Sequence, residues 1–205
     1  MAWAGTVISE DLAADGNFEA FTTSGAAIFI TLNPRELLSL VINTDWDGAG
    51  TDELEIQVLG GHQISSGNTP DVVTDASNIS LDTLAGAPDA QAADDDLTGR
   101  YFVMTTGGEI AEVRLITSSA SADDSIVLDH ALSGSPETSE TYDLYSLGVI
   151  SQFLIDLADP AEDVSMAVSL DVVGYPVVLV MARVTGTPTD TPTARLTYDK
   201  DGVSV

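Results

Sequence analysis

The densest group of potential metal ligands is segment 45–53, which reads Asp-Trp-Asp-Gly-Ala-Gly-Thr-Asp-Glu. Alternate carboxylates and chain-reversing glycines suit calcium, which takes about six to eight oxygen ligands. The spacing and the closing Glu do not match an EF-hand. Asp45, Asp47 and Asp52 are therefore candidate calcium ligands. The alternative is an acidic hairpin tip with Trp46 packed beside it.

The other titratable residues form no recognisable catalytic pattern. His62 and His130 have turn-like surroundings, and their spacing does not indicate a shared metal, so we interpret them as unrelated surface histidines. Among 33 acidic residues, some carboxylate pair will fall at a glycosidase-like separation by chance. The sequence has no nucleophile elbow, P-loop or Gly-x-Gly-x-x-Gly motif, and no cysteine. We expect no enzyme activity, no catalytic residues and no cofactor beyond the candidate calcium.

The charge balance restricts the partners of this chain. It has 33 acidic and 6 basic residues, with a formal net charge of −27. Phosphate and anionic lipid surfaces are bound by clustered Lys and Arg, so we expect neither nucleic acid nor membrane as a partner. The scattered arginines are interpreted as anchors inside or between subunits. They are Arg35, Arg100, Arg114, Arg183 and Arg195.

The same charge indicates the environment of the protein. An acidic domain of this kind repels itself in dilute buffer, and this repulsion is screened at about 1 M salt, where the Debye length is about 3 Å. Hydrophobic residues make up 44% of the chain, which is too many for an acidic disordered tail. The composition resembles that of proteins from halophilic hosts. The alternative is an acidic extracellular or viral surface protein from a mesophile.

The hydrophobic pattern predicts β-strands separated by turn residues. Apolar residues alternate around 38–42 and 54–58, on either side of the candidate calcium loop. The run 177–184 is apolar on both faces, which predicts a central strand in the core or a protomer interface. Segment 33–38 is expected to form at most one helical turn, because an Asn-Pro start precedes a strand-like stretch. Further strands are expected at 26–32, 100–106, 110–118, 125–129, 141–147, 164–170 and 194–198.

Turn and linker residues between positions 65 and 96 divide the strand pattern. We predict an all-β fold, a jelly-roll-like β-sandwich with an inserted small β domain. The sandwich domain comprises residues 1–66 and 148–205. Residues 67–96 are a loop or linker, and residues 97–147 form the inserted β-barrel-like or hairpin domain.

The predicted insert contains three notable stretches. They are LTGRYFVMTTGGEIAEVRLITS (97–118), DSIVLDHAL (124–132) and SPETSETYDL (135–144). They resemble a β module common in virion proteins of tailed phages, which runs G-aromatic-x-x-x-T-x-G, R-x-I-x-S, T-apolar-x-apolar and P-x-x-S-x-Y-x-apolar. The chain departs from it at 108–112, where the module usually has a small residue, Gly and Gln before the Arg. Segments 174–176, 185–187 and 198–203 also resemble the closing strands of phage virion β-sandwich proteins.

The resemblance implies a structural virion protein of a tailed virus, adapted to high salt by its composition. The expected role is a capsid decoration or auxiliary protein that binds the major capsid lattice and stabilises the head. The resemblance implies a homotrimer or other ring on the capsid surface, assembled in the host cytoplasm. One alternative is a tail, neck or baseplate protein. Another is a carbohydrate- or receptor-binding β-sandwich module that uses the Trp46 loop.

Overall fold

The computed structural model contains antiparallel β-strands and confirms the predicted all-β class. It describes residues 7–11, 16–23, 26–27, 29–32, 36–45, 53–68, 78–80, 96–107, 112–120, 125–134, 136, 140–156, 164–185 and 193–202. Within these ranges, no helix is long and apolar enough to cross a membrane.

The chain divides into two compact units. Unit 1 comprises residues 1–24, 28–61 and 148–205, and unit 2 comprises residues 25–27 and 62–147. Strands β7 (Glu53–Asn68) and β12 (Thr141–Asp156) contribute to both units, because the boundaries fall inside them. Strand β8 (Asn78–Ser80) lies within the segment that was expected to be a linker. The exact predicted domain limits remain a prediction.

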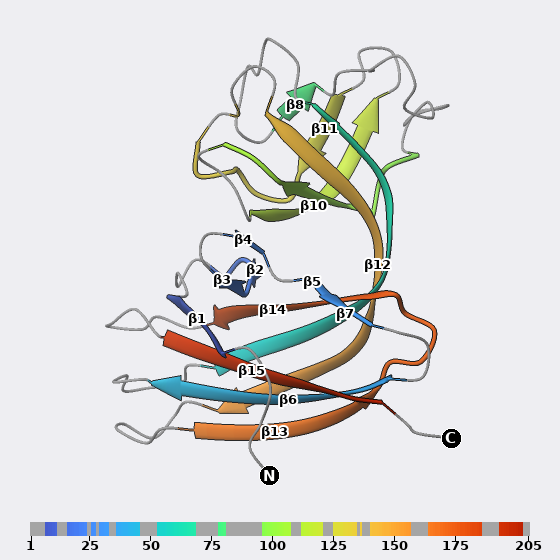
Figure 1. Ribbon diagram of the computed structural model, residues 1–205. Helices are drawn as coiled ribbons and strands as arrows, with labels where there is room; N and C mark the ends of the chain where they lie inside the picture. The colour runs from blue at the N-terminus through green and yellow to red at the C-terminus, as the bar shows by residue number, and fades with distance from the viewer. Residues whose placement is uncertain are drawn as a thin grey trace. The chain divides into compact units, whose positions relative to one another are not determined.

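Unit 1 contains two sheets (Figure 1). The first has the order β1-β15-β6-β13, formed by β1 (Val7–Asp11), β15 (Thr193–Gly202), β6 (Glu36–Asp45) and β13 (Val164–Asp171). In the second, β14 (Val177–Thr185) pairs with β7 on one side. On its other side it pairs with β2 (Glu19–Ala20) and β5 (Phe29–Thr31). Strand β12 follows β7 in the strand order, and the short β3 (Thr22–Thr23) lies in the N-terminal part of unit 1, whereas β4 (Ala26–Ala27) falls in unit 2.

The core of unit 1 is built from the inward-facing residues of both sheets, as the sandwich prediction requires. Leu38, Leu40 and Ile42 of β6 share one buried cluster with alternate residues of β7 and β14. The predicted 177–184 strand is central, and its residues 178–182 are all buried within the single chain. Of the two roles predicted for this strand, the structure therefore assigns it the core and not a protomer interface.

Unit 2 contains the strand order β12-β9-β10-β11-β8. Its strands include β9 (Tyr101–Met104), β10 (Val113–Ala120) and β11 (Ser125–Leu128). A second buried cluster fills this unit, and within it Phe102 and Tyr142 stack with ring centroids 5.2 Å apart. Such aromatic pairs add about 0.5–1.5 kcal/mol beyond the burial of their area.

Candidate functional site

The predicted calcium loop is only partly described. Asp45 is the last residue of β6, and no contact of its side chain is described. Asp47, Asp52 and Trp46 lie outside the described residues. The calcium site and the Trp46 binding site therefore remain predictions.

The two histidines lie in unit 2 but in different settings. His62 is inside the long strand β7, so its predicted turn-like setting is wrong. His130 follows β11, and its Nδ1 lies 3.2 Å from Oδ1 of Asp129. The same Asp129 oxygen accepts hydrogen bonds from the backbone N–H groups of Leu115 and His130. Within the described part of the chain, no three His, Cys, Asp or Glu side chains gather as metal ligands.

A charged cluster joins three strands of unit 1. Glu55 of β7 is only 5% exposed and lies directly opposite Arg183 of β14 in the strand register. Arg183 Nε donates a 2.6 Å hydrogen bond to Glu55 Oε2, and its Nη2 lies 2.5 Å from the same oxygen. The amide of Gln152 in β12 donates to Glu55 Oε1. The guanidinium carbon of Arg183 also lies 4.5 Å from the ring centroid of Phe18. The ion pair and its added hydrogen bond offset part of the desolvation penalty of burying these groups.

A second charged cluster stabilises unit 2. Arg114 of β10 is buried, and its Nη2 lies 2.5 Å from Oε2 of Glu112. Its Nη1 and Nε donate to the carbonyl oxygens of Val113 and Ala131. Glu112 accepts hydrogen bonds from the backbone N–H and hydroxyl of Ser133. The cluster therefore attaches the segment after β11 to the start of β10, which is the internal anchoring predicted for an arginine.

Two neighbouring residues at the start of β12, Asp143 and Tyr145, have raised pKa values. The Tyr145 hydroxyl contacts Asp143 Oδ2 at 3.5 Å, and Gln63 also hydrogen-bonds Asp143. Burial raises the pKa of Asp143 above its ordinary value, although these hydrogen bonds oppose the shift. Burial and the nearby Asp143 carboxylate raise the pKa of Tyr145 to about 12. A carboxyl of raised pKa is a feature of catalytic acids, so Asp143 is the residue at which to test for enzyme activity.

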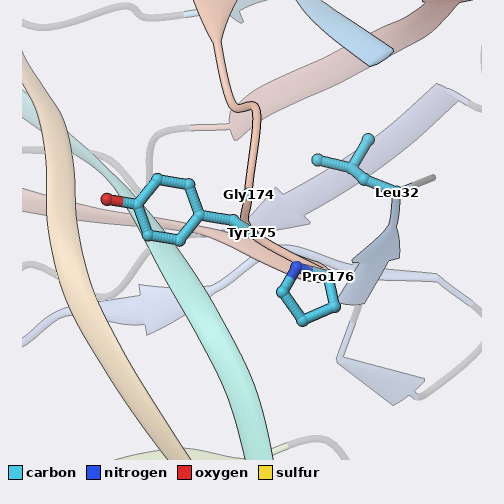
Figure 2. A pocket seen from close by; sticks show the side chains of 4 residues that line it. All are labelled: Leu32, Gly174, Tyr175 and Pro176. Carbon is cyan, nitrogen blue, oxygen red and sulfur yellow. The ribbon is translucent and has the colours of Figure 1, made fainter. Parts of the chain in front are cut away.

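A small cavity lies at the turn between β13 and β14. Leu32, Gly174, Tyr175 and Pro176 line its volume of about 110 Å³. Figure 2 shows the Leu32 side chain and the Tyr175 ring on opposite sides of the turn backbone. Ligand pockets usually have volumes of about 300–1,000 Å³, so this cavity is too small for a typical organic ligand.

The outer strands of unit 1 present apolar side chains to solvent. In β12, Val149 is 56% exposed and Leu154 is 61% exposed. Ile150 and Phe153 of β12, and Met166 and Val168 of β13, are partly buried against the core. Sequence reasoning missed this surface. The sequence feature that could have identified this surface is the absence of acidic residues from 148–155 and from 164–170 in a strongly acidic chain.

These features define an all-β protein with a β-sandwich unit and a second β unit. No protein-family model matches the chain, and no curated protein matches its sequence. Comparison with solved structures finds the VP16–VP17 complex, a complex of the two major capsid proteins of bacteriophage P23-77. The match has 11% identity and a TM-score of 0.21, covering 98% of this chain and 100% of that chain. A TM-score this low carries no inference about fold or function.

Proposed function

We propose that this chain is a structural virion protein of a tailed virus, and more specifically a capsid decoration or auxiliary protein. The observation that carries the proposal is the placement of the resembling segments, which supply β9, β10, β11 and the start of β12. Together they form most of the described part of unit 2. The resemblance therefore covers a folded unit and not isolated turns.

Individual positions of the resembling segments have structural roles that support the proposal. Gly99 and Gly107 flank β9 and adopt φ values of +80° and +100°, which favour glycine. Arg114, the Arg of the R-x-I-x-S phrase, is buried, and its Nε donates to the carbonyl oxygen of Ala131. Tyr142, in the resembling segment 135–144, stacks on Phe102. The resembling segments thus supply turns, a buried arginine and part of the aromatic core of one unit.

The proposed role is mechanical. The protein binds the major capsid lattice as a homotrimer or other ring and holds neighbouring capsomers against the pressure of the packaged genome. The net charge of −27 supports a hydrated surface in concentrated salt. Its partners would be the major capsid protein or other virion proteins, and its location the capsid surface.

The proposal includes the absence of enzyme activity. Its test is a hydrolase screen of the full chain, including glycosidic and ester substrates, with Asp143→Asn as the matched variant. We expect no turnover from either protein. Turnover by the wild type that Asp143→Asn abolishes would show an enzyme and refute this part of the proposal.

The location is tested on particles released by cells that carry the gene. Heads and tails are separated, and the protein is measured in each fraction by quantitative mass spectrometry. We expect it with the heads, at a fixed ratio to the major capsid protein. Copurification with tails after head removal would make it a tail, neck or baseplate protein. Absence from particles would refute the virion function, and glycan binding lost on Trp46→Ala would favour a carbohydrate-binding module.

A further inference from the structure

Unit 1 has two long outer strands that lack the usual protection against pairing. Strand β13 pairs with β6 on one side, and residues 148–155 of β12 follow β7 in the strand order. In the described part of the chain, no strand pairs with the other side of either segment. Natural edge strands are usually short, charged or interrupted by proline, because unpaired N–H and C=O groups recruit other chains. Segments 148–155 and 164–170 contain neither a charged residue nor proline.

The other outer strand of the first sheet, β1, is short and contains acidic residues. Strand β1 has 5 residues and ends in Glu10 and Asp11. With 33 acidic residues in 205 positions, the fifteen residues of 148–155 and 164–170 would carry about two acids if acids were evenly spread. Other long strands do contain internal acids, such as Glu55 in β7 and Asp199 in β15. Acid-free stretches also occur at 37–44 in β6 and in β14, but these strands are paired on both sides. Segments 148–155 and 164–170 differ from them because, in the described part of the chain, one side of each is left unpaired.

The two segments belong to one surface, which we call the β12–β13 edge (residues 148–155 and 164–170). Both strands contribute side chains to the same core cluster. Both lie along the lower side of unit 1 in Figure 1. The exposed Val149 and Leu154 add apolar area that water solvates poorly. At about 3.3 Å per residue, segment 148–155 offers a pairing edge about 26 Å long.

We propose that the β12–β13 edge binds a second copy of this chain by β-strand pairing. The charge decides which occupant fits. A basic partner would be attracted to acidic surface and would gain nothing from an acid-free edge. A copy of this chain carries the same charge of −27, so it can approach closely only where acids are absent. The edge is acid-free, its exposed polar side chains Gln152 and Ser169 are uncharged, and its exposed Val149 and Leu154 are apolar.

The proposed pairing uses β12, whose exposed Val149 and Leu154 are apolar, and two arrangements of β12 satisfy it. If β12 pairs with β12 of the second copy, the contact is self-complementary and gives a twofold dimer. If β12 pairs with β13 of the next copy, the contact is head-to-tail, and it forms a ring where the rotation between copies closes and an open filament where it does not. A ring of this kind would be the oligomer that the proposed function requires. This part of the inference therefore rests on the proposed function. Association of the purified chain is measured without particles, so failure of one proposal is distinguishable from failure of the other.

The first test is sedimentation equilibrium of the full chain at about 0.1 M and about 1 M NaCl, where the Debye length falls from about 10 Å to about 3 Å. We expect the wild type to associate, and more tightly in the higher salt. Leu154→Glu should weaken association by at least about tenfold, because it places a like charge without a partner in the contact. Val127→Glu is the matched control, because Val127 is an exposed apolar strand residue of unit 2. It adds the same charge and should leave association unchanged.

The second test locates the contact by cross-linking. The chain has no cysteine, so each introduced thiol is unique. Cross-linking of Leu154→Cys with itself would support β12–β12 pairing. Cross-linking only in a mixture of Leu154→Cys and Ala167→Cys would support β12–β13 pairing, since Ala167 is exposed on β13. A wild type that is monomeric at both salt concentrations would overturn the proposal. So would equal effects of Leu154→Glu and Val127→Glu, or association without either cross-link.

Discussion

The buried Glu55–Arg183 pair provides a quantitative test of how this acidic chain uses its few cations. In Arg183→Met, the apolar stem of the side chain is retained while both short contacts to Glu55 Oε2 are lost. The carboxylate then keeps only the Gln152 amide as a described side-chain partner. Removing one member of a fully buried pair costs about 3–5 kcal/mol. Because the Arg183 side chain is 35% exposed, water can reach part of the site. We therefore expect a loss of about 2–3 kcal/mol after allowing for solvent screening.

The assay is chemical and thermal unfolding of the purified chain. For a protein of this size, a loss of about 2–3 kcal/mol corresponds to a fall in melting temperature of about 4–12 °C. Arg195→Met removes an arginine from an exposed position of β15 and is the control for the change in net charge. Adding Glu55→Gln to Arg183→Met should recover much of the loss, because the unpaired buried charge is then gone. An Arg183→Met loss no greater than that of Arg195→Met would refute the coupling.

Three further predictions concern salt, packing and pH. The melting midpoint of the wild type should rise from dilute buffer to about 1 M NaCl, where repulsion is screened, and a flat curve would contradict the argument from charge. Gly67→Ala should lose about 1–3 kcal/mol in urea unfolding, because a Cβ would lie 2.7 Å from Cζ of the buried Tyr142. Gly148→Ala, whose Cβ meets nothing within 4 Å, should be neutral or more stable by up to about 1 kcal/mol. The pKa of Tyr145 is raised to about 12, so the unfolded chain releases this proton first and stability is lost as pH rises from about 10 towards 12. Tyr145→Phe should remove this alkaline component from pH-dependent unfolding, and an unchanged profile would contradict it.

The strand pattern was predictable where side chains alternate between core and solvent. Leu38, Leu40 and Ile42 are buried on one face of β6, as their spacing predicts. The alternation around 54–58 predicted only part of the next strand, which extends from Glu53 to Asn68. Strand β7 continues through Gly60, where a Cβ would meet the Tyr175 ring at 2.8 Å. There glycine permits close packing inside a strand, a role that depends on tertiary contacts and has no local signature.

The polar clusters could not be predicted from local sequence patterns, because they depend on which strands pair and in which register. Glu55 and Arg183 are 128 residues apart, and they meet because β14 pairs with β7 in one register. A shift of one residue would place Arg183 in the core and Val184 on the outer face. The apolar pattern of each strand fixes its face, but only the pairing of the two strands identifies Glu55 as the partner. Residues 46–52 of the candidate calcium loop lie outside the described residues, so the calcium prediction still rests on residue type and spacing alone.

The basic and acidic residues of this chain meet different requirements: two arginines stabilise the fold, and the excess of acids keeps the surface hydrated. Arg114 and Arg183 are used within the fold, where they neutralise Glu112 and Glu55. Since the chain has only 6 basic residues for 33 acidic ones, most acids must be balanced by ions from solution. A surface of that kind stays soluble in brine but opposes contact between identical copies at every acid-bearing position. Identical copies can therefore meet at low electrostatic cost only along a segment without acids, and salt should strengthen that contact by screening the rest of the surface. The acid excess and the uncharged β12–β13 edge are thus two parts of one arrangement, which predicts that stability and self-association increase together with salt.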